Sequence, residues 1–175
     1  MRLLKRSLFC APLLALMVIL VGLPAVAFGR DDDSSTRFSA RLIGINEVPS
    51  INTDGTASLK LKLNSASMDF ELSFHNLSQP PAAAHIHFGQ ARTNGGVMVF
   101  FCGGGGKPAC PTTTSGTVTG NIVPTDVVGP AVQGIKGDDL ASVMRAIRED
   151  AAYANMHTPN FPSGEIRGQI VKTDN

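Results

Sequence analysis

The sequence contains no tryptophan, one tyrosine and only 6% aromatic residues in all. Aromatic side chains form the platforms on which proteins stack unpaired bases, and a concentrated stripe of basic residues is the usual mark of nucleic-acid binding. Charged residues make up 17% of the chain and nearly balance, at a formal net charge of +1. The composition therefore argues against nucleic acid, and also against an anionic membrane surface, as a partner.

The sequence also lacks a hydrophobic run long enough for a membrane-spanning helix, which needs roughly 20 apolar residues. The longest run, from Leu8 to Leu23, has about 16. Basic residues precede it and the A-x-A cleavage site Ala25-Val26-Ala27 follows it, which is typical of a secretory signal peptide over residues 1–27. The alternative is an uncleaved anchor. Cleavage removes three basic residues and no acid, so it changes the formal charge from +1 to −2 and leaves a secreted or cell-envelope protein without a transmembrane span.

Cysteine is scarce, and only Cys102 and Cys110 follow the predicted cleavage site. In an exported protein an even pair favours a disulfide, which here closes a small glycine-rich loop and contributes roughly 2–3 kcal/mol if it is unstrained. The alternative is a redox pair or a soft-metal site. Seven intervening residues, however, fit neither C-x-x-C chemistry nor zinc-ribbon spacing.

Signatures of catalysis are absent as well. After the predicted cleavage site, the chain has no G-x-S-x-G elbow and no cysteine outside the expected disulfide, one of which a nucleophilic hydrolase would require. The glycines before Lys107 suggest a phosphate loop, but Pro108 follows where Ser or Thr is needed. Glycoside hydrolysis is left open, because it depends on how far apart two carboxylates lie in space. The sequence favours no enzyme class.

Alternation of apolar and polar residues is what the sequence has in abundance. Residues 28–36 include the polar run Asp31–Thr36 and are predicted to form a disordered leader, so the folded domain covers residues 37–172. The continuous apolar run 97–101 is predicted to be a central strand buried on both faces. Strands are expected over residues 38–45, 57–63, 68–75, 84–88, 97–101, 116–123, 152–158 and 164–171.

One segment has the period of a helix. Leu140, Val143, Met144 and Ile147 recur at i, i+3, i+4 and i+7, which predicts a short amphipathic helix from roughly Asp138 to Asp150. With the predicted strands, it indicates an all-β domain: an antiparallel Greek-key sandwich or flattened barrel of about eight strands.

Three histidines lie in predicted strands. Side chains alternate along a strand, so His85 and His87 face the same side, and His157 can join them from a neighbouring strand. Such a set can converge on one ion at about 2.0–2.1 Å, and three nitrogens suit copper or zinc. The alternative is that the rings only hydrogen-bond their neighbours. Ring nitrogens within about 4–5 Å of one another, facing a cleft, would favour the ion.

A carboxylate stands close to this set in the sequence. Glu165 begins the closing strand eight residues after His157, and the intervening turn predicts that it lies beside the histidine. There it can accept a hydrogen bond from the ring N–H and fix the tautomer of a metal-binding histidine. The alternative is an ion pair with Arg167, two residues further along.

Blocks spread over the chain resemble the CHRD domain, which is named for the protein chordin and occurs widely in bacterial exported proteins. The resemblance runs from about Phe38 to Ile170, and it implies an extracellular β-rich single-domain module without an established general activity. Ser50, where the family often has a second proline, and the cysteine-closed loop depart from its pattern. The matching blocks are Asn46-Glu47-Val48-Pro49, Gly55 with Ala57, Ala84-His85-Ile86-His87 with Gly89, Asn155-Met156-His157-Thr158, and Gly164-Glu165-Ile166-Arg167-Gly168-Gln169.

A more distant likeness concerns the histidines. His85-Ile86-His87 looks like the copper-binding strand of copper/zinc superoxide dismutases, which are Greek-key barrels, and His157 resembles their late copper histidine. The bridging histidine and the zinc ligands have no counterpart, so the likeness does not extend to dismutase activity. Taken together, the sequence favours a non-enzymatic module that binds an extracellular protein or matrix partner, with a copper- or zinc-binding protein as the alternative.

Overall fold

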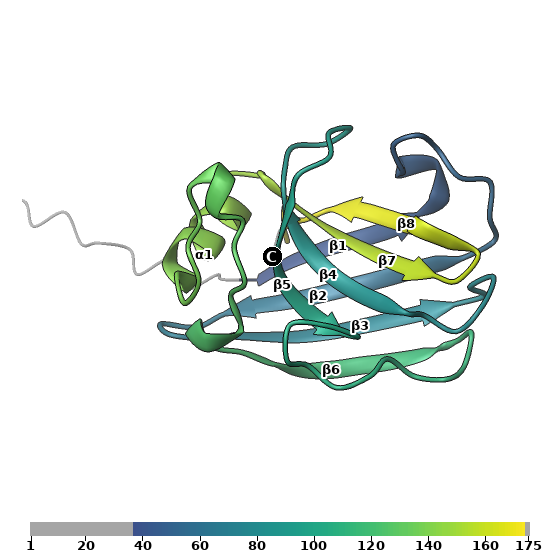
Figure 1. Cartoon of the computed structure of the whole chain (residues 1–175), viewed down its shortest axis with the longest axis horizontal. Helices are drawn as coiled ribbons and strands as arrows, with labels where there is room; N and C mark the ends of the chain where they lie inside the picture. Colours follow the sequence, from purple (N-terminus) through teal and green to yellow (C-terminus); the bar gives the residue numbers. More distant parts are fainter. Residues whose placement is uncertain (1–36, 174–175) are drawn as a thin grey trace, which may run out of the picture. The chain divides into compact units, whose positions relative to one another are not determined.

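The computed structural model describes residues 37–173, so the predicted signal peptide and leader lie outside the described residues. Nine antiparallel strands form a single sheet, and one α-helix lies between the sixth and seventh (Figure 1). The elements are β1 (Arg37–Ile43), η1 (Gly44–Asn46), β2 (Thr56–Leu63), β3 (Met68–His75), β4 (Ala83–Phe88), β5 (Gly96–Cys102), β6 (Gly116–Ile122), η2 (Pro124–Asp126), η3 (Ala131–Gln133), α1 (Leu140–Arg148), β7 (Ala152–Thr158), β8 (Phe161–Gln169) and β9 (Val171–Lys172).

The strand order makes the sheet a nearly closed barrel. Neighbouring strands follow the order β5-β4-β7-β8-β1-β2-β3-β6, and the short β9 pairs with β1 beyond β8. The end strands β5 and β6 contact each other without forming a ladder. Around the barrel, the consecutive strands β4, β5 and β6 are neighbours, and the strand on the other side of β6 is β3. The chain therefore crosses from β3 to β4 past two strands, which is a Greek-key arrangement. All eight predicted strands are therefore present, and the all-β prediction is confirmed.

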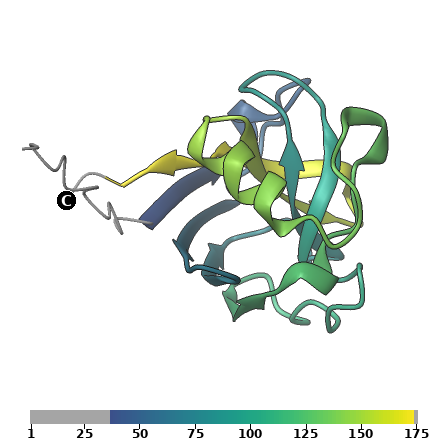
Figure 2. The ribbon, with the colours of Figure 1, turned by 90° about the vertical axis from the view of Figure 1, so that its left-hand side faces the viewer.

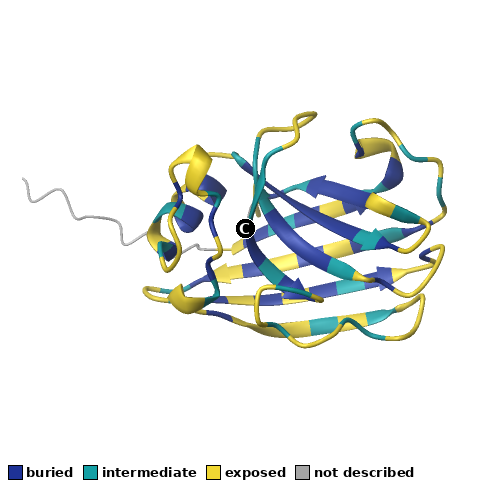
Figure 3. Ribbon diagram, viewed as in Figure 1, coloured by how far each residue is buried: buried dark blue, intermediate teal, exposed yellow. Residues whose placement is uncertain are grey.

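Alternation along the strands gives the barrel its core. In β2, Leu59, Leu61 and Leu63 are buried while Lys60 and Lys62 between them are exposed (Figure 3). β3 repeats this pattern against β2 through a register without shifts. Each fully buried leucine contributes roughly 1.5–3 kcal/mol, so the inward faces of these strands supply most of the cohesion at this side of the barrel.

The helix covers one open end of the barrel (Figure 2). Asp139 caps its start, accepting a hydrogen bond from the Ser142 backbone N–H at 3.0 Å. Its apolar stripe, which includes Val143 and Ile147, joins the core. The predicted helix is thus confirmed and two residues shorter at each end. Among residues 37–173, no helix combines the length and apolar character needed to cross a membrane.

Two details of the predicted strands were wrong. β5 is at one end of the strand order, and its Val97 and Phe100 are only partly buried, so it is not a central strand buried on both faces. β8 begins at Phe161, so the turn after β7 is shorter than predicted. The apolar run of β5 has another explanation: the loop that follows it folds back over the outer face of Phe100.

That loop is closed by the predicted disulfide, which is confirmed. Cys102 and Cys110 are bonded, with Cα atoms 4.9 Å apart. Within the loop, a Cβ on Gly104 or Gly105 would lie 2.5 or 2.6 Å from the Phe100 ring. Glycine therefore permits the backbone to lie flat against this aromatic ring, which shields it from water.

Candidate metal centre

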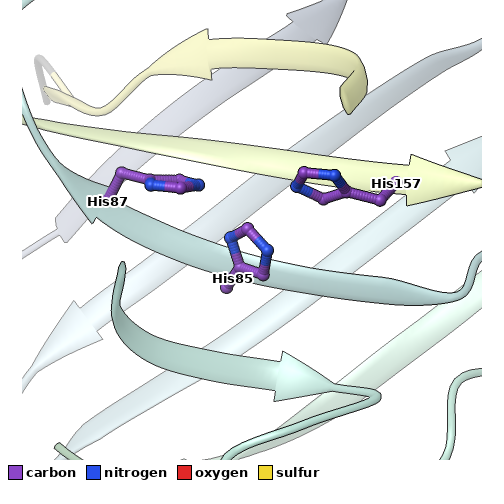
Figure 4. A group of neighbouring side chains, drawn as sticks. All are labelled: His85, His87 and His157. Carbon is purple, nitrogen blue, oxygen red and sulfur yellow. The ribbon is translucent and has the colours of Figure 1, made fainter. Parts of the chain in front are cut away.

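Two neighbouring strands present the three histidines on one face. β4 pairs with β7 so that Ala83 lies opposite His157, and directly opposite residues share a face of the sheet. Ala83 alternates with His85 and His87, whereas the intervening Ile86 is fully buried in the barrel core. The histidines therefore point away from that core, on the outer face of the barrel (Figure 4).

The rings are close enough to share an ion. One ring nitrogen from each of His85, His87 and His157 lies within 4.8 Å of the other two. Three points no further apart than this have a common centre at most about 2.8 Å from each, against the 2.0–2.1 Å of a metal–imidazole bond. Each nitrogen would therefore move inward by less than about 1 Å to bind, and the distance expected for an ion is met.

Backbone carbonyls fix the tautomers of two of the rings. Nδ1 of His87 lies 2.8 Å from the Gly95 carbonyl oxygen, and Nδ1 of His157 lies 3.0 Å from that of Pro162. A carbonyl only accepts, so both Nδ1 atoms carry the hydrogen and both Nε2 atoms carry a lone pair. Those two Nε2 atoms and Nδ1 of His85 are buried and have no hydrogen-bond partner within residues 37–173.

Burial keeps the imidazoles neutral. It lowers the pKa of His85 to about 2, helped by the neighbouring histidines. It also lowers the pKa of His87 to about 4, against the opposing effect of the Gly95 carbonyl. The pKa of His157 is lowered for the same main reason. Because a metal binds the unprotonated ring, the three ligands need lose no proton at neutral pH.

Aromatic rings pack around the cluster. Tyr153 stacks on His87 at 4.6 Å between centroids and 8° between planes, and Phe100 meets His85 edge-on at 5.0 Å. The guanidinium carbon of Arg167 lies 4.3 Å from the Tyr153 ring centroid. Because His87 and Arg167 cannot occupy the same face of that ring, Tyr153 separates the histidine from the cation.

A buried ion pair holds Arg167 in place. Its Nε donates to Glu47 at 2.8 Å, and its other nitrogens donate to the Thr93 carbonyl and to Asn94, each at 2.8 Å. Glu47 also accepts a hydrogen bond from Asn155. Burial raises the pKa of the Glu47 carboxyl, although Arg167 opposes the effect. This network connects the loop after β1 and the loop after β4 to strands β7 and β8, which carry Asn155 and Arg167.

Both predictions for Glu165 were wrong. Its carboxylate accepts hydrogen bonds from Thr53, Ser78 and Thr158 at 2.6–2.8 Å, not from a histidine or from Arg167. Burial alone would raise the pKa of Glu165, but these donors outweigh it and the pKa lies below its ordinary value. The reason is a register shift between β7 and β8, which brings Glu165 to the inward-facing Thr158 and away from His157.

Glu47, Tyr153 and Asn155 were missed as members of the site. A signal was available for two of them, because Tyr153 and Asn155 alternate with His157 and must share its face. Glu47 lies in the Asn46–Pro49 block, but nothing local in that block indicates a partner 120 residues away.

A cleft of about 610 Å³ lies next to the cluster. It runs between the loops containing Ile45 and Arg92, and Tyr153 and Arg167 also line it. Ile45 is 68% exposed at this cleft. Tyr153 therefore stands between the cleft and His87.

Comparison with known proteins gives one match. The family model for the CHRD domain matches residues 38–170, which is most of the chain and nearly all of the described residues. No curated protein and no solved structure matches the chain. The matched span includes the three histidines, both members of the buried ion pair and both cysteines of the disulfide. The chain therefore belongs to the CHRD domain family.

Proposed function

We propose that this CHRD-domain protein is exported and binds one copper or zinc ion through Nδ1 of His85 and Nε2 of His87 and His157. Two observations support it: each ring places a nitrogen within 4.8 Å of the other two, and each ring has one buried nitrogen without a hydrogen-bond partner among the described residues. A buried polar atom left unpaired costs about 1–3 kcal/mol. Three such atoms in one place constitute an arrangement that a shared ion would stabilise.

The surrounding contacts favour the same function. The Gly95 and Pro162 carbonyls hold two of the rings in the orientation and tautomer that a metal requires. The low pKa values of His85 and His87 remove competition by protons at neutral pH. Export is supported by the disulfide, since disulfides persist mainly in oxidising compartments, and by the predicted signal peptide.

Calorimetric titration of the purified mature protein with copper or zinc salts tests this function. We expect one ion per chain, bound with a dissociation constant below micromolar. The triple variant His85→Ala, His87→Ala, His157→Ala should bind none. The matched control is His75→Ala, because His75 is exposed on β3 and belongs to no cluster of the described residues. Absence of binding by the wild type at micromolar concentration would exclude the proposed function.

Binding of an extracellular protein or matrix partner is a second candidate, and the observation that favours it is the cleft with Ile45 exposed at its edge. A photo-crosslinking residue placed at Ile45 in the native host tests it. A discrete adduct that is absent when the same group replaces the exposed Lys60 would support it. Equal crosslinking at both positions would contradict it.

A further inference from the structure

The three histidines offer a bound ion no negative charge. Among residues 37–173, the group that can hold a metal contains histidines alone. The nearby acid Glu47 already forms an ion pair with Arg167, and Glu165 is committed to three hydroxyl-bearing residues. An ion bound by neutral imidazoles therefore keeps its whole charge.

The three nitrogens are also withdrawn from water. Each has less than 1 Å² of accessible surface, and the rings are flanked by Phe100 on one side and Tyr153 on the other. Phe100 and Tyr153 cover part of the rings of His85 and His87. Within the described residues, the protein therefore supplies three nitrogen ligands and no others.

The charge of the ion then decides which ion fits. The cost of moving an ion into a medium of low dielectric constant grows with the square of its charge, so a divalent ion costs about four times as much as a monovalent one. Zinc is almost always four-coordinate in proteins, and Cu(II) favours square-planar or tetragonal sites.

We infer that the site selects Cu(I), held by three neutral nitrogens in a trigonal arrangement, over Zn(II) and Cu(II). This inference rests on the proposed function, since it specifies the ion at the same three histidines. Because Cu(I) is preferred over Cu(II), the protein stabilises copper in its reduced state. A site of three neutral nitrogens makes the protein a holder of Cu(I) rather than a zinc-dependent hydrolase.

Competition against chelators tests the inference on the mature wild-type protein. Cu(I) is titrated under anaerobic conditions against bicinchoninate, and Cu(II) and Zn(II) are titrated in parallel against chelators of known affinity. We expect Cu(I) to bind at least about a hundredfold more tightly than either divalent ion, and X-ray absorption of the Cu(I) form to show three nitrogen neighbours. Tighter binding of Zn(II) or Cu(II), or a fourth ligand on Cu(I), overturns the inference but leaves the proposed function standing. If none of the three ions binds, the proposed function fails and the inference with it.

A pair of variants tests the role of charge. Phe100→Asp places a carboxylate beside His85, and Phe100→Asn places a neutral group of the same size there. A negative charge a few ångströms from the ion favours a divalent ion over a monovalent one by about tenfold or more. The ratio of Zn(II) to Cu(I) affinity should therefore be at least tenfold higher in the Asp variant. Equal ratios in the two variants overturn the argument from charge.

Discussion

The buried ion pair between Glu47 and Arg167 allows a sharp test of the structure. The two side chains are only 3% and 6% exposed, so loss of one partner leaves a buried charge without compensation. Such a loss costs about 3–5 kcal/mol. For a domain of this size, the Arg167→Met variant should unfold at a temperature lower by about 10–20 °C. Urea and thermal unfolding of the purified protein measure both quantities.

The exposed pair of Lys60 and Glu71 is the matched control. Its N–O distance of 2.8 Å equals that of the buried pair, but its side chains are 73% and 47% exposed. Solvent screening limits such a pair to about 0–1 kcal/mol, so Lys60→Met should change stability by less than about 1 kcal/mol. If the two variants lose equal stability, burial does not determine the strength of the pair, and the argument is wrong.

The pH dependence of Arg167→Met gives an independent check. Without the guanidinium, burial raises the pKa of Glu47 still further above its ordinary value. The folded variant then binds a proton more tightly than its unfolded chain does, so its stability relative to wild type improves as the pH falls. The loss of stability should be smaller at pH 5 than at pH 8. The opposite trend would show that Glu47 remains charged and solvated.

Three further predictions follow from the histidines, from Gly164 and from Glu165. His85 and His87 bind protons more weakly in the folded protein than in the unfolded chain. The metal-free protein should therefore lose stability as the pH falls below 6.5, by about 1.4 kcal/mol per pH unit for each titrating histidine. Urea unfolding between pH 7 and pH 4 measures this loss, and a flat profile contradicts it. Gly164→Ala should cost about 1–3 kcal/mol in urea unfolding, because φ is +127° and the new Cβ would lie 2.7 Å from the paired buried carboxylate, whereas Gly134→Ala, also at positive φ but in open space, should cost less. Glu165→Gln should lower stability by about 1–3 kcal/mol and leave metal affinity, measured by calorimetry, within about twofold, well short of the 10–100-fold loss caused by removing a group that orients a ligand histidine.

Local alternation explains why so much of the barrel is predictable from the sequence. The period of two in β2 and β3 determines which side chains enter the core, and it also places His85 and His87 on one face. His157 joins them only because β4 pairs with β7. The sequence does not show this pairing; it shows only that a third histidine lies in another predicted strand. The histidine cluster was therefore predictable as a candidate, and its geometry was not.

The failures occur where local periodicity is interrupted. The register shift between β7 and β8 redirects Glu165 toward Thr158, and no rule based on alternation anticipates it. The partner of Arg167 comes from the loop after β1, so it depends on the closed barrel and not on the neighbouring sequence. β5 has the composition of a central strand because the disulfide-closed loop covers its outer face. From composition alone, a strand covered by a loop cannot be distinguished from a strand covered by another layer of sheet.

The pairing of the first strand with the last long one determines when the molecule can fold. β1 meets β8 through Ile43 and Arg167, so the barrel cannot close until nearly the whole chain is available. Contacts between such distant segments form slowly, because the intervening loop must first be ordered. His157 and the Pro162 carbonyl that orients it lie on β7 and β8, so the histidine cluster is complete only after these late strands have joined the sheet, and an ion can be bound by all three rings only then.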